Sequence, residues 1–415
     1  MEVIKDVKKL INQALGKENM FGFKTTLANQ MYLLFCLIGN VYFTEKIHRK
    51  TKLVWFCCAN GVLLFVGFSF IFCLIFAKPM EDILLLVYMV YEVTYTSMEV
   101  IVKPAIAIFW YRDEIEQMIS MADKILLKQQ LTKGSYENDL DVNKIMKYSS
   151  VVLVMSILLY NTITLTDLIL FYEEEKVKNY MYYVTPLPGL TKFGSMTLYM
   201  AYTVLFSSFS FGGFILIILH RVFAIPWAVI CHNETQRIIK ELNSVSEDVD
   251  INIDTFKRIE PKFRYVMRKC IRDINDLNRF VTSFRGFFET IASFVLPITL
   301  YVSVTHVLMA ISPGLSFVIR MRELFPFFYS IIEVYLICWV GATLKQTVSD
   351  LSFAVYSTPW YWLKSIRKDV YILLCQTQAE INLRALSVYP LTLSTFLRFC
   401  NVINSTVNVF RAYTN

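Results

Sequence analysis

The sequence predicts an all-α, polytopic membrane protein with seven transmembrane helices, a cytoplasmic N-terminus, an extracellular C-terminus and a cytoplasmic helical anchor bundle. Three observations lead to this fold class. First, 55% of the residues are hydrophobic and only 18% are charged, whereas a soluble domain carries about a quarter charged residues. Second, seven apolar runs reach the roughly 20 residues that cross a bilayer. Third, lysine and arginine gather in every second connection between those runs, which is typical of cytoplasmic loops.

The apolar runs divide the chain into membrane and cytoplasmic segments. A further run at 30–43 has only about 14 residues, which favours a short re-entrant or interfacial helix within the cytoplasmic N-terminal segment 1–52. Spans one to four fall within 53–231, spans five and six within 286–344, and the last span within 391–415. Residues 232–285 and 345–390 are then cytoplasmic helices of the anchor. The predicted spans are residues 53–77, 83–110, 149–171, 193–221, 286–312, 325–344 and 391–413.

Orientation follows from the distribution of the 41 lysines and arginines. The N-terminal segment and the connections after spans two, four and six hold 31 of them, and the alternate connections hold six. Because cytoplasmic loops are enriched in these residues, the N-terminus is predicted inside and seven spans place the C-terminus outside. Residues 1–16 are polar and lysine-rich, unlike a cleavable signal peptide, which agrees with a cytoplasmic start.

Several function classes are disfavoured by this pattern. The topology is the reverse of that of a G-protein-coupled receptor, and no internal repeat suggests a transporter built from inverted halves. The basic residues form no nucleic-acid-binding signature. The histidines and cysteines have no metal-ligand spacing, and there is no phosphate loop or nucleophile elbow. The sequence therefore predicts no enzyme, no catalytic residue, no cofactor and no metal.

The long cytoplasmic connection between the fourth and fifth spans has a helical pattern. From His232 to Arg285, apolar residues recur at three- and four-residue intervals among the charges. We therefore expect the fourth, fifth and sixth spans to continue as helices into the cytoplasm. There they would pack into a bundle, the natural contact between subunits of an oligomer.

Aromatic residues gather in the outer halves of spans two, three, four and six. Aromatic rings with a hydroxyl group suit a cavity for a small, largely apolar molecule. At any single position, ordinary core packing or an interfacial aromatic belt is favoured over ligand contact, so only the cluster as a group is informative. The predicted pocket residues are Tyr88, Tyr91, Glu92, Tyr95, Tyr160, Ile163, Tyr199, Tyr202, Phe206, Phe328, Tyr329, Ile332 and Tyr335.

The last span carries a stripe of polar side chains along an otherwise apolar helix. Two interpretations stand at even weight: the stripe bonds to neighbouring helices, or it lines water in a conduction path. Elsewhere in the membrane, buried groups such as His306 and Glu333 are expected to face the bundle interior. The predicted pore or gate residues are Asn401, Asn404, Ser405, Asn408, Arg411 and Ala412.

The C-terminal third resembles the insect odorant receptor family. The resemblance rests on motifs of the sixth span, the helix after it and the entry to the last helix, in the family's order and spacing. Across the first two thirds only the layout is similar. The motifs are Cys338-Trp-Val-Gly341, Leu351-Ser-Phe-Ala354-Val-Tyr356, Trp360-Tyr361, Arg367, Gln376 to Ala379, and Pro390-Leu-Thr-Leu-Ser-Thr-Phe396.

The resemblance implies a ligand-gated, nonselective cation channel of four subunits in the plasma membrane of olfactory sensory neuron dendrites. The odorant would enter the outer pocket, the last helix would line the pore, and the gate would fall near Phe410 to Tyr413. Because the connection after span four lacks the long insertion of the family's co-receptor, the chain would be an odorant-tuned subunit that partners the odorant receptor co-receptor in a heterotetramer. A gustatory receptor of the same fold is the alternative, although that class's Thr-Tyr-x-x-x-x-Gln signature is absent from the last helix.

Overall fold

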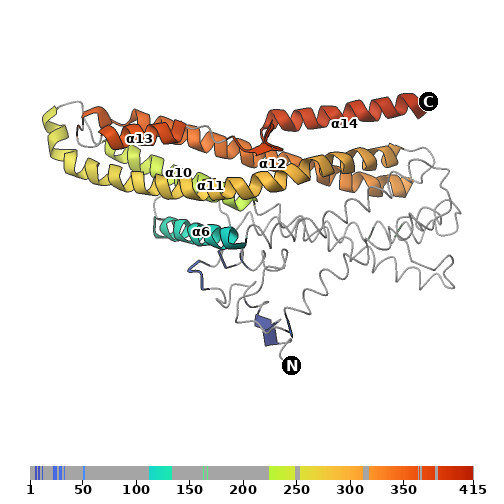
Figure 1. The fold of residues 1–415 in the computed structure, drawn as a ribbon, viewed down its shortest axis with the longest axis horizontal. Coiled ribbons are helices and arrows are strands. Elements are labelled where there is room, and N and C mark those ends of the chain that lie inside the picture. The colour runs from blue at the N-terminus through green and yellow to red at the C-terminus, as the bar shows by residue number, and fades with distance from the viewer. Residues whose placement is uncertain are drawn as a thin grey trace.

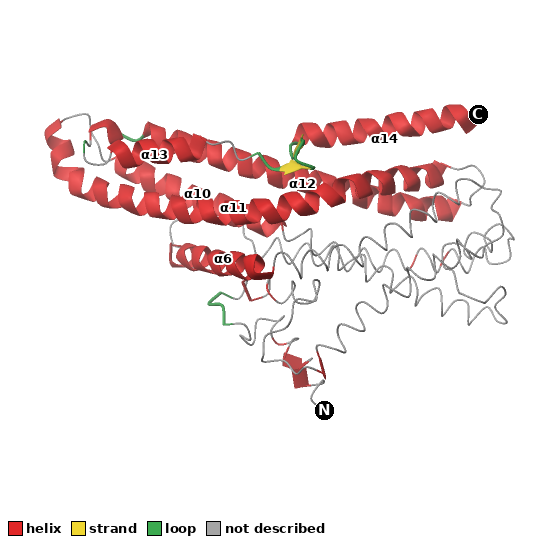
Figure 2. Cartoon of the chain, viewed as in Figure 1, coloured by secondary structure: helices red, strands yellow, loops and turns green. Residues whose placement is uncertain are grey.

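The computed structural model describes mainly the helices from residue 224 onward, together with one helix at 112–132. The predicted spans 53–77, 83–110, 149–171 and 193–221 and the predicted short helix 30–43 lie almost wholly outside the described residues. The described part is overwhelmingly helical (Figure 2). The structure describes residues 112–132, 224–247, 253–311, 317–362, 364, 367–378 and 382–414, with 5–6, 8–9, 12, 22–25, 28–29, 32, 50–51, 162 and 166.

Six α-helices, one short 3-10 helix and one small hairpin make up the described chain from residue 112 onward. In chain order they are α6 (Arg112–Thr132), α10 (Ala224–Glu247), α11 (Ile253–Ile311), α12 (Phe317–Ser357), η4 (Trp360–Trp362), α13 (Arg367–Gln378), β1 (Arg384–Ala385), β2 (Tyr389–Pro390) and α14 (Leu393–Thr414).

Helices α11 and α12 form a long antiparallel hairpin that runs the length of the molecule (Figure 1). At 1.5 Å per residue, the 59 residues of α11 measure about 88 Å, nearly three times the hydrocarbon thickness of about 30 Å. The predicted spans 286–312 and 325–344 are therefore parts of longer rods that continue beyond a bilayer. Helix α12 begins at Phe317, earlier than the predicted span.

Two helical stretches of the described chain, Glu260–Ile311 and Pro326–Ser357, are long and apolar enough to cross a membrane. Helix α14 has the length, with 22 residues, but its polar side chains lower its hydropathy below that of the other two. It begins at Leu393, two residues after the predicted start of the last span. Its composition already sets it apart from a lipid-facing helix.

One half of the molecule is a closely packed bundle, which we call the anchor and define as α6, α10, α13 and the adjoining halves of α11 and α12. Helix α10 packs against α11 and α12, α6 packs on α10 and α11, and α13 packs on α12 (Figure 1). The buried rings of Trp227 and Phe280 stack with centroids 5.2 Å apart, and Phe284 lies 6.3 Å from Trp227. Such stacked aromatics bury large apolar areas and hold α10 against α11.

Helix α6 lies in a connection that the sequence analysis did not assign to a helix. Its buried residues Ile115, Met118, Ile119 and Ala122 recur at three- and four-residue intervals and face α10 and α11. The same spacing is visible in the sequence.

A β-hairpin joins the anchor to α14, and it too was not predicted. Strands β1 and β2 pair antiparallel, with Ala385 opposite Tyr389. The turn holds Leu386 and Ser387 at φ values of 52° and 59°, a left-handed conformation that costs a non-glycine residue about 1 kcal/mol or more. Short β-hairpins often carry an Asn-Gly or Asp-Gly pair in the turn, and this one has neither.

Candidate functional site

Helix α14 is started by a polar cap at the end of the hairpin. The Thr392 carbonyl accepts hydrogen bonds from the amides of Thr395 and Phe396 at 3.0 and 3.2 Å. The Thr392 side chain bonds the hydroxyls of Ser394 and Thr395 at 2.8 and 3.3 Å. Threonine is a favoured residue at this position of a helix. The motif that begins at Pro390 thus fixes where the last helix starts.

One face of α14 is apolar and packs on α11 and α12, on the parts of these helices that lie away from the anchor. Phe399, Ile403 and Val407 recur every four residues and are buried. They form one cluster with Leu308 of α11 and with Val334 and Cys338 of α12. This packing explains why a helix with so many polar side chains lies along the α11–α12 hairpin (Figure 1).

The opposite face of α14 carries the predicted pore residues. All six are exposed, and no other described element of the chain covers them: Asn401, Asn404, Ser405, Asn408, Arg411 and Ala412. The amide of Asn408 donates to Asn404 Oδ1 at 3.4 Å within the same helix. Since an uncovered row of amides and hydroxyls is costly in lipid, this face requires water or another polar chain.

The four predicted pocket residues that the structure describes lie on α12. Phe328, Ile332 and Tyr335 share one face, with exposed fractions of 58%, 54% and 42%, and Tyr329 is half-buried on another side. The structure thus groups three of the four. The remaining predicted pocket residues lie outside the described residues: Tyr88, Tyr91, Glu92, Tyr95, Tyr160, Ile163, Tyr199, Tyr202 and Phe206.

Tyr335 also contacts α14, which the sequence did not indicate. Its ring meets that of Phe396, in the first turn of α14, edge to face with centroids 5.5 Å apart. The outward aromatic face of α12 therefore ends against the start of α14. This contact connects the region of the predicted pocket with the helix of the predicted pore.

Buried ionisable groups lie at the end of the α11–α12 hairpin that is farther from the anchor, where α11 ends and α12 begins. His306 Nδ1 and Glu323 Oε2 are 2.7 Å apart and both side chains are buried. Glu333 is also buried, so both residues named from the sequence face the interior as expected. The His306 contact bridges the two helices near their turn.

The hairpin before α14 is held by side chains of α11. Glu289 Oε1 accepts a hydrogen bond from the Arg384 amide at 2.8 Å, and Ser293 Oγ accepts one from the Leu386 amide at 2.6 Å. Arg285 Nε donates to the same Glu289 oxygen at 3.1 Å. The bond to the Leu386 amide offsets part of the strain in the turn, because it satisfies the amide of a residue with positive φ.

Helix α12 approaches the same junction through a glycine. A Cβ atom at Gly341 would lie 2.2 Å from the carbonyl oxygen of Leu391, far inside van der Waals contact. Gly341 belongs to the sixth-span motif, and Leu391 belongs to the motif at the entry to the last helix. The close backbone approach is a physical reason for glycine at this position.

The anchor is held by a network of buried charges centred on Arg237 of α10. Its guanidinium donates to Glu234 from Nη2 at 2.7 Å and from Nε at 3.1 Å, and from Nη2 to Asp273 of α11 at 2.5 Å. Lys128 of α6 donates to Asp273 at 2.9 Å. Glu241 links Arg237 to Lys269 of α11. Three helices are thereby joined by charge-assisted bonds.

Lys128 and Arg237 of this network keep their charges over the physiological pH range. Burial lowers the pKa of Lys128, but the hydrogen bond and charge of Asp273 outweigh it, so the pKa is raised above 10.5. Burial also lowers the pKa of Arg237. The carboxylates of Glu234 and Asp273 outweigh burial, so the pKa of Arg237 is raised too. A raised pKa means that the Lys128 contribution is complete below the ordinary lysine pKa and is lost only in strong alkali.

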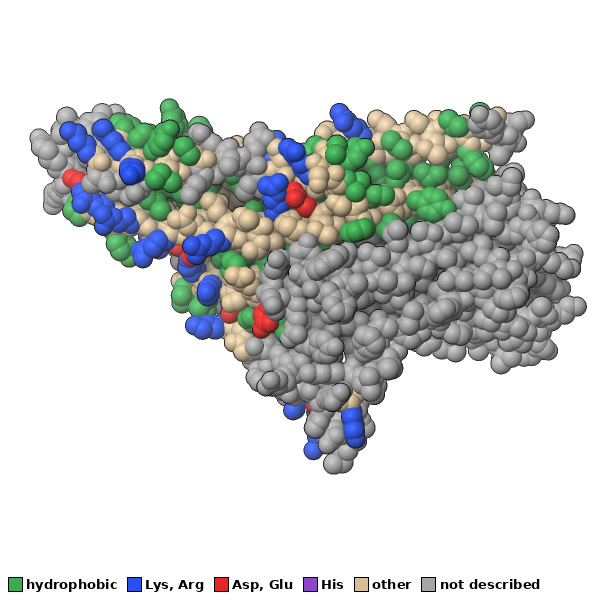
Figure 3. All heavy atoms as spheres, in the orientation of Figure 1, with side chains coloured by type: hydrophobic (Ala, Val, Ile, Leu, Met, Phe, Trp, Pro, Cys, Tyr) green, Lys and Arg blue, Asp and Glu red, His purple; other side chains and the backbone are tan. Residues whose placement is uncertain are grey.

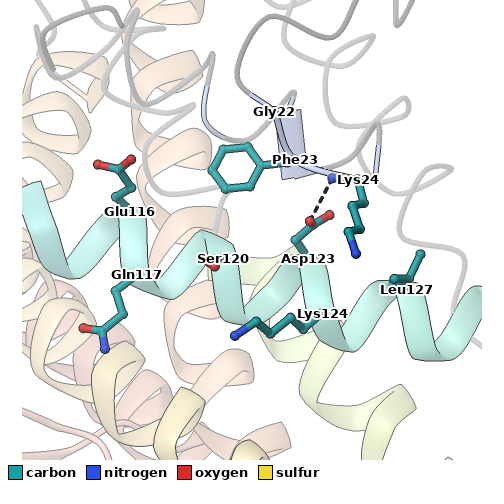
Figure 4. A pocket seen from close by; sticks show the side chains of 9 residues that line it. All are labelled: Gly22, Phe23, Lys24, Glu116, Gln117, Ser120, Asp123, Lys124 and Leu127. Carbon is teal, nitrogen blue, oxygen red and sulfur yellow. Dashed lines mark hydrogen bonds between the residues drawn. The ribbon is translucent and has the colours of Figure 1, made fainter.

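A polar cavity of about 520 Å³ lies between α6 and residues 22–24 (Figure 4). Asp123 accepts hydrogen bonds from the Lys24 amide at 2.8 Å and from the Thr25 amide and hydroxyl, both at 2.7 Å. The lining carries charges of both signs, including Lys124 and Glu116. This cavity was not predicted, and its polar walls differ from those expected for an apolar ligand. Asp123 acts there as a clamp on the N-terminal segment.

The two halves of the molecule also differ in surface chemistry. On the face shown in Figure 3, lysine and arginine side chains of the described residues gather over the anchor, and hydrophobic side chains form a patch along α14 and the helices next to it. Together with the apolar stretches of α11 and α12, this division gives the described chain a charged bundle at one end and, at the other, an apolar pair of helices with the half-polar α14 packed on it.

Comparison with known proteins identifies the family. The family described as 7tm Odorant receptor matches residues 85–403. The chain therefore belongs to the odorant receptor family, as the C-terminal motifs indicated, and it is a membrane receptor rather than an enzyme. No curated protein matches the sequence.

Solved structures with the same fold include the insect olfactory receptor OR5 from Machilis hrabei. In its complex with eugenol, the superposition has a TM-score of 0.68 at 8% identity and covers 100% of both chains. Another structure of OR5 gives a TM-score of 0.58 at 10% identity over 99% of both chains. The likeness extends over the full length of the fold.

Proposed function

We propose that this chain is an odorant-tuned subunit of a ligand-gated, nonselective cation channel, assembled with the odorant receptor co-receptor in a heterotetramer. The observation that carries the proposal is the two-sided α14: its apolar face packs on the hairpin, and the amide and hydroxyl groups of Asn401, Ser405 and Asn408 are exposed. Four such helices around an axis would enclose a polar path. Membership of the odorant receptor family indicates that the ligand that opens the channel is an odorant.

In this proposal, the N-terminus and the anchor are cytoplasmic and the C-terminus is extracellular. The protein resides in the plasma membrane of olfactory sensory neuron dendrites. An epitope tag placed before Met1 should bind antibody only after the cell is permeabilised. Labelling of intact cells would refute this orientation.

The proposed ligand is a small volatile, bound by aromatic and aliphatic side chains of the second, third, fourth and sixth predicted spans. Eugenol, the ligand in one Machilis hrabei OR5 structure, is a reasonable first compound. If Ile332 lines this pocket, Ile332→Ala should shift the half-maximal odorant concentration and leave the maximal current unchanged. An unchanged half-maximal concentration would remove Ile332 from the pocket.

The direct test is a voltage-clamp recording from cells that express the chain with the co-receptor, without added nucleotides or G protein. Eugenol and a broad panel of alkyl, terpenoid and aromatic volatiles should include at least one that evokes a cation current. Cells expressing the co-receptor alone are the control for current that does not depend on this chain. Absence of any evoked current despite demonstrated surface expression would count against the proposal.

A further inference from the structure

Arg398 lies on the same outward face of α14 as the predicted pore residues. It is exposed and belongs to the second turn of the helix, at the end that joins the anchor. Side chains spaced by three or seven residues share one helical face. Arg398 precedes Asn401 by three residues and Ser405 by seven, so it continues their row toward the anchor.

Nothing described in the chain neutralises this guanidinium. Helix α14 contains no aspartate or glutamate between Leu393 and Thr414. No ion pair found within the described residues involves Arg398. The carboxylate of Glu289, which lies beside the β-hairpin, is already bound by Arg285 and by the Arg384 amide. The row of amides and hydroxyls thus ends in an uncompensated positive charge.

We propose that Arg398 is a specificity-determining residue, which places a positive charge at the cytoplasmic mouth of the pore and favours monovalent over divalent cations. This inference rests on the proposed function, because it requires that α14 line the conduction path. The electrostatic energy of an ion near a fixed charge scales with the charge of the ion. Repulsion by Arg398 therefore acts on Ca²⁺ twice as strongly as on Na⁺.

The expected size of the effect is modest and measurable. At a separation of about 8 Å in a water-filled mouth, removing one such charge should raise the permeability ratio of Ca²⁺ to Na⁺ roughly twofold. The ratio should rise further with each copy of the chain in the assembly. The effect should shrink at high ionic strength, since salt screens exposed charges.

The experiment uses spontaneous openings in inside-out patches from cells that express the full chain with the co-receptor, so no agonist is needed. Arg398→Gln should raise the Ca²⁺/Na⁺ permeability ratio, read from the reversal potential. Arg398→Cys should do the same. Reaction of that thiol, from the cytoplasmic side, with a trimethylammonium-bearing thiosulfonate should restore the parent ratio, whereas a sulfonate-bearing reagent should raise it further.

Two controls isolate the residue. The parent chain treated with both reagents reports on native thiols, of which Cys375 is exposed and Cys400 is partly exposed. Thr406→Cys provides a control position on the same helix: Thr406 is exposed, but at about 100° per residue it lies about 140° around α14 from Asn401 and about 100° from Ser405. Charging Thr406→Cys should leave the permeability ratio at its parent value.

Two results would overturn the inference alone: an unchanged ratio in Arg398→Gln, or equal responses to the cationic and the anionic reagent. Either would mean that Arg398 contacts lipid headgroups or a neighbouring chain instead of the ion path. Failure of the proposed function is recognised separately, by the absence of openings that depend on this chain or by normal conductance in Asn401→Leu. That result would overturn both proposals.

Discussion

The anchor and α14 satisfy their polar groups in opposite ways. In the anchor, Arg237, Glu234 and Asp273 are buried and bonded to one another across helices. On α14, Asn401, Ser405 and Asn408 are exposed, with no other described element over them. The first region is complete within one chain. The second needs water or another polar chain, and this difference is the basis for the proposed pore.

The largest effect is expected in the anchor. Arg237→Met would leave the buried carboxylates of Glu234 and Asp273 without their shared cation, at a cost of about 3–5 kcal/mol. We expect loss of folded protein, measured by thermal stability on size-exclusion chromatography in detergent. Arg268→Met, at an exposed position of α11, is the matched control and should change stability little. Equal stability of the two variants would show that the network is not structural.

The junction between the regions is sensitive to one added methyl group. Gly341→Ala would place a Cβ 2.2 Å from the Leu391 carbonyl, so the start of α14 or α12 must shift, at a cost of about 1–3 kcal/mol. Gly286→Ala in α11 is the control, since a Cβ there meets nothing within 4 Å; it should stabilise the helix by about 0.5–1 kcal/mol. Opposite signs in the melting temperature would support the account, and equal signs would contradict it.

The two faces of α14 should respond differently to truncation. Ile403→Ala removes a buried side chain from the cluster with Leu308 and Val334 and should cost about 2–4 kcal/mol. Asn404→Ala, one position along, should change stability by less than about 0.5 kcal/mol. Melting temperatures of the two purified variants test this. If Asn404→Ala were as damaging as Ile403→Ala, the polar face would be packed within the protomer.

The smallest effect on stability is expected at the β-hairpin formed by β1 and β2. Ser293→Ala removes the acceptor of the Leu386 amide and should cost about 1 kcal/mol. Thr290→Ala on the same helix is a suitable control, because the Thr290 hydroxyl bonds back to the Gly286 carbonyl. We expect the Ser293 variant to melt at the lower temperature. An inverted order would show that the hairpin does not depend on α11.

Sequence alone predicted the features that follow from periodicity and composition. The apolar stretches of α11 and α12, which were predicted as the fifth and sixth spans, the two-sided α14 and the burial of His306 and Glu333 all follow from where apolar and polar residues stand along a helix. The family motifs around Gly341 and Pro390 were recognised as patterns. Their physical reason, the contact of Gly341 with the Leu391 carbonyl, became visible only when distant segments were placed together.

Features that depend on contacts between distant residues could not be predicted. The bond of the Leu386 amide to Ser293 spans 93 positions, and the Arg237–Asp273 contact spans 36. The hairpin turn lacks any residue with a preference for positive φ, so no local signal announces it. Tyr335 was assigned to a ligand pocket from its neighbours on α12, and its contact with Phe396 emerged from the packing of α14.

The central claim, that the outward face of α14 lines an aqueous ion path, is tested most directly by cysteine substitution along that helix. Chains carrying cysteine at one of Asn401, Ser405 or Asn408, co-expressed with the co-receptor, should lose current when a charged thiosulfonate reagent is applied. Cysteine at Phe399, Ile403 or Val407 should give no change, because these positions are buried against the hairpin. Insensitivity of the first three, or block at the buried three, would contradict the account.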